Sequence, residues 1–361
     1  MKIFLVSNMY PSGTDPDYGI FVKNFKENFE SLHGVSFVES VIKGRTKGLL
    51  SKILSYSSLL LSVIKNYLKG NYDIIYIHFI SHTAPAFFLP LLFCPNKKPI
   101  IVNVHGADVI KYNKGLYKFF NDFLLKKSSF LVAPSNYFKQ ICINEFPFLP
   151  KDSIFVNPSG GIDSLKFSPK FLGKKNYKIV NLGFVSRIEE DKGWKDFIDV
   201  IQFLLKKGYK VKAIMAGTGS QVNELNKIIK ENNLKQNIDY KGLVNHDKLV
   251  EIYQELDLFI FSSNRISESL GLVGLEAMAC GIPVIAYDMA GPKTYIINQS
   301  NGYLVSPGNS SKIANSVINY LNLNVEDKLE MQRKAILTAK NFDSISVSEK
   351  LYEKVKSSIA S

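Results

Sequence analysis

Short apolar runs recur along the first half of the chain, and the segments between them show apolar positions at helical spacing. A parallel sheet covered by helices on both faces produces such runs, because its strands are buried on both sides. Strands that alternate with helices therefore predict an α/β domain with right-handed crossovers. The strands predicted in this half are Lys2–Ser7, Ile74–Ile77, Ile100–Val104, Phe130–Ala133 and Ile154–Val156.

The alternation stops in a polar, turn-rich stretch and then begins again. Turn residues occupy Asn157–Gly161, and a second loop-like stretch runs from Ser168 to Lys175. An apolar stripe from Trp194 to Leu205 then predicts a helix that ends at Gly208. The strands predicted in this second half are Lys178–Phe184, Lys212–Ala216, Ile238–Tyr240, Leu258–Phe261 and Pro283–Ala286.

Two doubly wound, Rossmann-like α/β domains in tandem are the predicted architecture. We expect an N-terminal domain over residues 1–165 and a C-terminal domain over residues 166–340. Residues 341–361 contain a last helix that either closes the second domain or crosses back to the first. Doubly wound sheets bind ligands at the carboxyl ends of their strands, so we expect a ligand in a cleft between the domains.

The composition is that of a globular protein, with 46% hydrophobic and 21% charged residues among 361. Cys94, Cys142 and Cys280 are scattered in apolar surroundings, as reduced buried thiols are, which favours a cytoplasmic compartment. The apolar run after Met1 is too short for a signal peptide. No stretch reaches the roughly 20 apolar residues of a membrane-spanning helix.

The formal net charge is +13, and most of the excess lies in the first half. Such an excess attracts polyanions or serves solubility alone. Residues 43–69 form a basic, amphipathic segment that fits a helix lying on an anionic membrane surface. The alternative is a helix with its apolar face packed on the first sheet. No nucleic-acid-binding module is recognised, so nucleic acid is not an expected partner.

The segment from Glu268 to Glu276 carries the strongest chemical signal. A loop follows the strand Leu258–Phe261, and Gly271 then opens a helix. Free amides at a helix N-terminus bind anions, and a glycine lets a phosphate approach the backbone. Glu268 before this terminus and Glu276 about a turn inside it are placed to accept hydrogen bonds from hydroxyls on either side of a phosphate. That layout suits a nucleotide sugar; the alternative is a capping carboxylate and a surface one.

Arg187 and Lys192 follow the strand Lys178–Phe184 and lie at the same predicted sheet edge as Gly271. Two cations beside a helix N-terminus would neutralise a leaving diphosphate. The alternative is a solvated pair beside neighbouring acidic residues.

Three residues of the first half are candidates for the same cleft. His105 follows the strand Ile100–Val104 and is placed to contact a sugar hydroxyl or the transferred group, although a structural histidine is equally compatible. Asp108 would orient His105, cap the next helix or meet the acceptor. Gly19 ends the first loop, where its amide would meet a phosphate or serve a plain turn.

A metal site is not expected. Asp15-Pro16-Asp17 has the spacing of a metal-binding Asp-X-Asp, but it lies in a turn-rich loop with no partner ligands in the sequence.

Taken in order, these motifs resemble the family 4 retaining glycosyltransferases of the GT-B fold (glycosyl transferases group 1). The similarity covers nearly the whole chain and is densest from Lys178 to Gly308. The matching pieces are Glu-X7-Glu from Glu268 to Glu276, Arg187-X4-Lys192, Val104–Asp108, Asn301–Val305 and Pro307–Asn309, the last two as the family's closing loop.

The resemblance implies a role for each candidate residue. Arg187 and Lys192 would hold the donor diphosphate, Glu276 the ribose and Glu268 the donor sugar. Amides of Gly271, Leu272 and Val273 would contact the phosphate and sugar. His105 would contact the transferred sugar near the reaction centre, and Gly19 would face the phosphates. The family needs no metal or other cofactor and retains the anomeric configuration.

Two departures from the family pattern bear on the donor sugar. Ala290-Gly291-Pro292-Lys293-Thr294 lacks the acidic residue that usually follows the proline, and Leu270-Gly271 replaces the common Phe-Gly. Neither removes a donor-binding group.

The function expected from this resemblance is transfer of a hexose or N-acetylhexosamine from a nucleotide sugar, UDP by default, to a hydroxyl of a lipid-linked saccharide. This activity would serve O-antigen, capsule or lipopolysaccharide assembly, with the enzyme peripheral on the inner face of the plasma membrane. Two alternatives stay open: a sugar-nucleotide epimerase of the same architecture, and a catalytically silent scaffold subunit.

Overall fold

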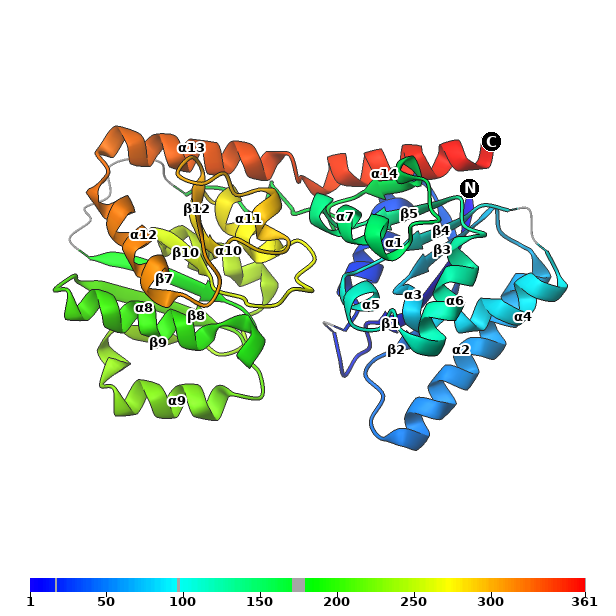
Figure 1. Cartoon of the computed structure of the whole chain (residues 1–361), viewed down its shortest axis with the longest axis horizontal. Coiled ribbons are helices and arrows are strands. Elements are labelled where there is room, and N and C mark those ends of the chain that lie inside the picture. The colour runs from blue at the N-terminus through cyan, green and yellow to red at the C-terminus, as the bar shows by residue number, and fades with distance from the viewer. Residues whose placement is uncertain (17, 96–97, 171–178, 361) are drawn as a thin grey trace. The chain divides into compact units, whose positions relative to one another are not determined.

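The protein consists of two compact units in the computed structural model, which describes residues 1–16, 18–95, 98–170 and 179–360 (Figure 1). The first unit comprises Met1–Gly161 and Ile345–Ser361, and the second comprises Ile162–Ser344. The predicted boundaries were 1–165, 166–340 and 341–361. No helix among the described residues is long and apolar enough to cross a membrane.

The first unit contains a six-stranded parallel sheet with the strand order β2-β1-β3-β4-β5-β6. Its central strand β3 is buried at every position, as expected for a sheet covered on both faces. The strands are β1 (Lys2–Tyr10), β2 (Ser36–Lys43), β3 (Ile74–His78), β4 (Ile100–Asn103), β5 (Phe130–Ala133) and β6 (Ile154–Val156).

Two sets of helices cover this sheet. One face packs against α1 and α14, and the other packs against α2, α3, α4, α6 and α7. The helices are α1 (Ile20–His33), α2 (Leu49–Lys69), α3 (Ile80–Thr83), α4 (Pro85–Phe93), α5 (Ala107–Ile110), α6 (Gly115–Leu125), α7 (Asn136–Glu145) and α14 (Ser344–Ala360). A 3-10 turn, η1, spans Lys151–Ser153.

The second unit contains a second six-stranded parallel sheet, in the order β12-β11-β10-β7-β8-β9. Its strands are β7 (Val180–Val185), β8 (Val211–Ala216), β9 (Ile238–Tyr240), β10 (Leu258–Phe261), β11 (Val284–Tyr287) and β12 (Gly302–Val305). Both sheets are doubly wound, so the predicted α/β class and two-sheet architecture are confirmed.

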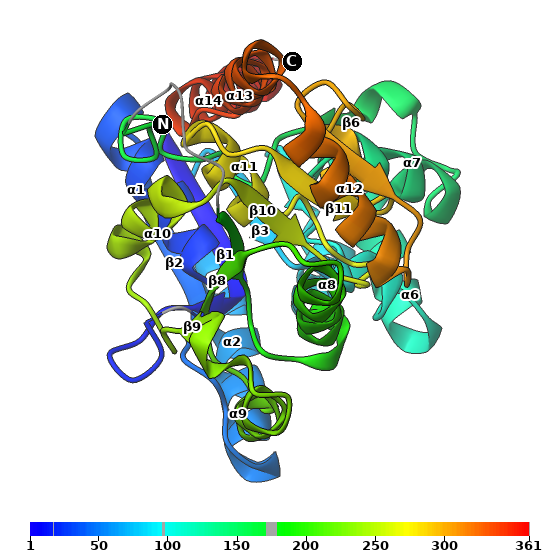
Figure 2. The same cartoon turned by 90° about the vertical axis from the view of Figure 1, so that its left-hand side faces the viewer.

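One face of the second sheet packs against α8, α9 and α12, and the other packs against α10, α11 and α13. Figure 2 shows α8 and α12 side by side. The helices are α8 (Trp194–Lys206), α9 (Val222–Glu231), α10 (Leu249–Glu255), α11 (Leu272–Ala279), α12 (Ser310–Asn322) and α13 (Val325–Lys340); the 3-10 turns are η2 (Glu190–Lys192), η3 (Leu234–Gln236), η4 (His246–Lys248) and η5 (Pro292–Thr294).

The last helix belongs to the core of the first unit. Leu351 and Val355 of α14 are buried with residues of β1 and α1, and the Asn157 side chain donates a hydrogen bond to the Val347 carbonyl oxygen. Of the two predicted alternatives, crossing back to the first domain is therefore the one observed.

Four expectations from the sequence need correction or restriction. Cys94 is exposed rather than buried, because it lies just after α4. Residues 301–305 are not a loop: most of them form the edge strand β12. Helix α2 begins only at Leu49, because Lys43 still belongs to β2. Asp17, Lys178 and the part of the predicted loop from Phe171 to Lys175 lie outside the described residues.

Candidate donor-binding site and the His78–His105 pair

The carboxyl ends of β7 and β10 bring the Lys192 turn against the loop after β10. Gly193 follows Lys192 with a φ of 72°, and a Cβ there would lie 1.8 Å from the Ser262 carbonyl oxygen. Only glycine allows this approach. Since β7 and β10 are neighbours in the sheet, Lys192 and Glu268 meet at this edge although they are 76 positions apart in the sequence.

Lys192 and Glu268 form an ion pair at this edge. Lys192 Nζ lies 2.5 Å from Glu268 Oε2, and the two side chains are 11% and 16% exposed. The Ser263 hydroxyl lies 3.3 Å from the same carboxylate oxygen. A charge-assisted contact with little exposure holds both groups in place. Lys192, predicted to bind the diphosphate, and Glu268, predicted to bind the donor sugar, are thus direct neighbours.

Arg187 lies two residues beyond β7 and is exposed. Its neighbour Glu189 ties this loop to the loop after β8, because the Ser220 backbone amide and hydroxyl donate to the Glu189 carboxylate. These hydrogen bonds lower the pKa of Glu189, with a smaller contribution from Arg187. The loop that carries Arg187 is therefore anchored, while its guanidinium faces solvent.

Gly271 caps the N-terminus of helix α11 and has a φ of 80°. A Cβ at this position would lie 2.9 Å from the Phe261 ring, so space and backbone conformation both require glycine. The Leu272 and Val273 amides lie in the first helical turn, where backbone N–H groups have no intrahelical partner. The helix therefore presents an anion-binding pole on the second unit.

Glu276 lies in α11 and is only 5% exposed. His246 Nε2 lies 2.9 Å from its Oε1, and the Tyr253 hydroxyl donates to Oε2 at 2.9 Å. Burial and the Glu276 carboxylate raise the pKa of Tyr253 well above its usual value, so this hydroxyl is protonated at neutral pH. An ionised carboxylate has about four acceptor positions, so Glu276 retains capacity for a ligand hydroxyl.

His246 and Tyr253 were missed by sequence reasoning. They lie 30 and 23 residues before Glu276, in η4 and α10, and no local motif links them to it.

In the first unit, Gly19 is required by packing. Its φ is 73°, and a Cβ would lie 2.5 Å from the backbone carbonyl carbon of Met9. The end of β1 and the start of α1 therefore touch through their backbones. This accounts for the glycine as a turn residue; its predicted contact with a phosphate stays a prediction.

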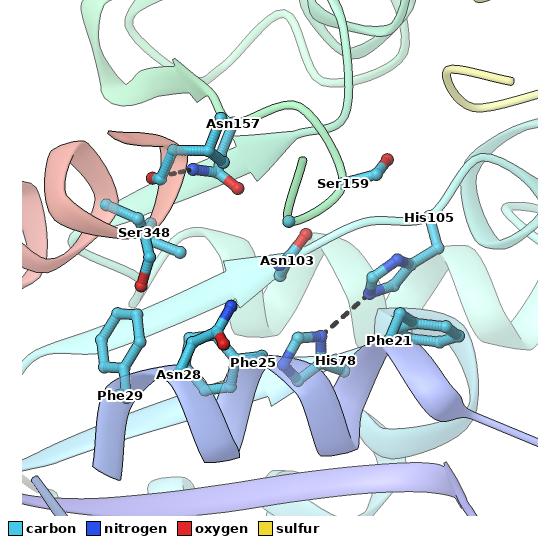
Figure 3. Close-up of a pocket in the computed structure, with 13 residues that line it drawn as sticks. Phe21, Phe25, Asn28, Phe29, His78, Asn103, His105, Asn157, Ser159 and Ser348 are labelled. Atoms are coloured by element: carbon cyan, nitrogen blue, oxygen red, sulfur yellow. Dashed lines mark hydrogen bonds between the residues drawn. The ribbon is translucent and has the colours of Figure 1, made fainter. Parts of the chain in front are cut away.

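His105 pairs with a second histidine that the sequence did not indicate (Figure 3). His78 Nδ1, at the end of β3, lies 2.9 Å from His105 Nε2, just beyond β4. Burial lowers the pKa of His105 to about 3 and that of His78 well below its usual value. Both rings are therefore neutral at pH 7, and one nitrogen of the pair donates to the other.

Asp108 is fully buried, so its carboxylate is not presented to an acceptor here. Its Oδ1 instead accepts a hydrogen bond from the His105 backbone amide at 2.9 Å. Burial raises the pKa of Asp108 to about 7, against the lowering effect of backbone hydrogen bonds. Asp108 thus fixes the turn that carries His105.

Within the described ranges, no three His, Cys, Asp or Glu side chains are grouped so that they could hold a metal ion.

The fold and this site define a class of protein. Residues 166–341, about half of the chain, match the model of the family "Glycosyl transferases group 1". The two doubly wound sheets form the GT-B fold.

Among relatives, the capsular polysaccharide biosynthesis glycosyltransferase CapM of Staphylococcus aureus is 28% identical over 173 residues. This match covers 45% of the chain but only 44% of CapM. The 2-deoxystreptamine N-acetyl-D-glucosaminyltransferase of Niallia circulans is 27% identical, over 77% of the chain and 75% of that protein. Among solved structures, Anabaena Alr3699/HepE in complex with UDP has a TM-score of 0.72 at 18% identity, and the match covers 99% of both chains.

Proposed function

We propose that this protein is a glycosyltransferase that moves a hexose or N-acetylhexosamine from a UDP-sugar to a hydroxyl of a lipid-linked saccharide, in the assembly of a cell-surface polysaccharide. The observation that carries the proposal is the Lys192–Glu268 pair beside the α11 N-terminus, with Glu276 one turn inside the helix. These groups suit the diphosphate, the sugar and the ribose of one nucleotide sugar.

Donor binding would replace the contact between Lys192 and Glu268 by contacts of each residue with the donor. Its diphosphate would take Lys192 and the exposed Arg187, while a sugar hydroxyl would donate to Glu268. The Leu272 and Val273 amides would add hydrogen bonds to the phosphate. His246 and Tyr253 hold the Glu276 carboxylate for the ribose hydroxyls. UDP is supported by similar solved structures, the complexes of Anabaena Alr3699/HepE with UDP and with UDP-glucose.

For the reaction we propose front-face attack with retention. The acceptor oxygen bonds to the anomeric carbon as the bond from that carbon to the phosphate oxygen breaks. The departing phosphate accepts the acceptor's proton, so the step needs no protein base and no metal. Lys192, Arg187 and the helix amides stabilise the charge that develops on the phosphate. His105 is neutral and held by His78, and in this proposal it would contact the transferred sugar.

The acceptor is inferred from two sources. Relatives are named for capsular polysaccharide biosynthesis and as a poly(ribitol-phosphate) α-N-acetylglucosaminyltransferase. Helix α2 exposes leucines beside its lysines, which supports contact with an anionic membrane on its cytoplasmic side.

The donor test is a thermal-shift series with UDP, GDP, ADP, CMP and dTDP on wild type, Lys192→Ala and Lys195→Ala. A ligand at 100 times its dissociation constant adds about 2.7 kcal/mol to stability. We expect a shift for UDP that Lys192→Ala abolishes. Lys195→Ala is the control, because that lysine is 40% exposed and pairs with Glu190 and Glu224 instead. Absence of any nucleotide shift in wild type would contradict the proposed donor.

Membrane contact is tested by co-sedimentation with anionic vesicles. The comparison variant replaces Lys43, Arg45, Lys47 and Lys52 by glutamate. Arg45 contributes least to the expected binding, because it pairs with Asp15 at 3.2 Å. Binding that is insensitive to salt and to these substitutions would favour a soluble acceptor.

A further inference from the structure

A groove with a volume of about 530 Å³ lies in the first unit, on the sheet face that α2 covers. This volume is in the range of pockets that hold small organic ligands. One wall is α2, and the other comes from α3, α4 and α6. The lining residues are Leu49, Lys52, Ile53, Tyr56, Ser57, Leu59, Leu60, His82, Pro85, Ala86 and Tyr117.

Exposed apolar side chains form the mouth of the groove. Leu49, Ile53 and Leu60 are 76%, 53% and 37% exposed, whereas Leu59 beside them is buried in the sheet core. Apolar surface that is concentrated along a groove marks a binding site, unlike single exposed leucines. The groove therefore fits a long, flexible apolar chain.

The charge at the groove is positive. The charged residues of α2 are Lys52, Lys65 and Lys69, and the helix contains no acidic residue. Lys52 is near enough to His82 to help burial lower the pKa of His82 to about 4, so Lys52 is the cation there while His82 is neutral. The preferred ligand is an anion with an apolar chain. A second copy of this face would bring lysine against lysine.

The inner end of the groove lies at the carboxyl edge of the sheet. The Asn8 side chain, near the end of β1, donates a hydrogen bond to the Tyr56 hydroxyl at 3.2 Å. His82 lies in α3, which follows β3 directly, and β3 ends at His78, the partner of His105. One edge thus carries both the groove and the His78–His105 pair.

We propose that this groove binds the hydrocarbon chain of an isoprenyl-phosphate-type acceptor, with Lys52 facing the phosphate. The saccharide attached to that phosphate would then be held at the carboxyl edge, where His105 lies. This inference rests on the proposed function for the identity of the acceptor. It assigns the acceptor's lipid to the groove rather than to the outer surface of α2.

The test uses the full chain and a benzophenone-bearing farnesyl diphosphate, competed by farnesyl phosphate below its aggregation concentration. We expect photocrosslinks in residues 49–60, 82–86 and at Tyr117. The double variant Ile53→Gln, Leu60→Gln should weaken farnesyl phosphate binding roughly tenfold or more, because two apolar contacts are lost. Leu61→Gln is the matched control: it lies on the same helix, is 67% exposed and does not line the groove.

Several results would overturn the proposal. The first is an equal loss of farnesyl phosphate affinity in the double variant and in Leu61→Gln. The second is competition by inorganic phosphate as strong as that by farnesyl phosphate. The third is concentration-dependent self-association of the protein that the double variant abolishes. Binding to anionic vesicles without binding of monomeric farnesyl phosphate would assign the leucines to membrane adsorption alone, and would also overturn it.

The nucleotide thermal shift is measured on the same preparations. If wild type binds UDP but not farnesyl phosphate, only the assignment of the acceptor's lipid to the groove is refuted. A wild type that binds farnesyl phosphate but no nucleotide refutes the donor assignment and leaves the groove standing.

Discussion

Glu276, the proposed ribose-binding residue, shows how the fold fixes a single carboxylate. It lies nearly buried, and the hydroxyl of fully buried Tyr253 donates to one of its oxygens while His246 contacts the other. A buried carboxylate without such partners would carry a large desolvation penalty. The pair Tyr253–Glu276 therefore serves stability and, in the proposed function, orients the carboxylate for the ribose, and experiment can separate the two contributions.

The first prediction concerns Tyr253→Phe. It removes one hydrogen bond to a charged group, so we expect the second unit to lose roughly 1.5–3 kcal/mol of stability and UDP affinity to fall. Urea unfolding and UDP titration are the measurements. Tyr303→Phe is the control, since Tyr303 is also buried in this unit but lies in β12. UDP affinity equal to that of wild type in Tyr253→Phe would mean that Glu276 needs no positioning.

The second prediction concerns Asp108, whose pKa burial raises to about 7. In the folded state Asp108 keeps its proton between roughly pH 4 and 7, while the unfolded chain releases it. The contribution of Asp108 to stability must therefore fall as pH rises through this window, by at most about 1.4 kcal/mol per pH unit, and level off above it.

Asp108→Asn removes this titration. The stability of wild type minus that of the variant, from urea unfolding at pH 4 to 8, should decrease up to about pH 7 and then stay constant. A difference that rises with pH would show that Asp108 is ionised in the folded protein. Burial lowers the pKa values of His78 and His105, so these histidines make stability rise with pH in both proteins. Subtracting the stability of the variant from that of wild type removes their contribution.

At the scale of elements, α14 is the last helix in the chain and completes the first core. Leu351 is 3% exposed and packs with residues of β1 and α1, whereas Ile359 near the end of the helix is 42% exposed. Leu351→Ala should cost about 2–5 kcal/mol of first-unit stability, because it removes buried methyl groups and leaves a cavity. Ile359→Ala should cost little. Urea unfolding followed by circular dichroism measures both, and equal losses would contradict this packing.

The strands also differ in how well the sequence predicts them. Interior strands such as β3 and β4 were recognised because burial on both faces makes them continuous apolar runs. The missed strands, β2 and β12, both lie at sheet edges. Half-exposed positions in β2 dilute its apolar run, and β12 has only four residues and starts with glycine.

The residues of the candidate site also fall into those that the sequence predicted and those that it missed. Lys192, Glu268 and Gly271 were found because each follows a predicted strand of the second half, so chain order alone brings them to one edge. The partners His78, His246 and Tyr253 were missed because each contacts its carboxylate or imidazole only through the tertiary fold. In helix α2 Leu59 is packed on the sheet, as the second alternative for residues 43–69 expected, whereas contact of exposed residues such as Leu61 with a membrane stays a prediction.

At the scale of the whole molecule, each unit has its own sheet and its own buried cores. Small domains with separate cores unfold as separate cooperative units when little couples them. The chain contains a natural reporter for this behaviour. Its single tryptophan, Trp194, is fully buried in the second unit. Tryptophan fluorescence therefore follows the second unit alone, whereas circular dichroism follows both.

The last prediction combines this reporter with the proposed donor site. UDP at 100 times its dissociation constant should move the fluorescence transition by about 2.7 kcal/mol and leave a second transition in circular dichroism unmoved. Leu351→Ala should do the reverse, because its side chain packs in the first unit only. If both signals shift together under UDP and under Leu351→Ala, the two units unfold as one. Donor binding to the second unit would then raise the free energy of unfolding of the whole chain, because neither unit could unfold without the other.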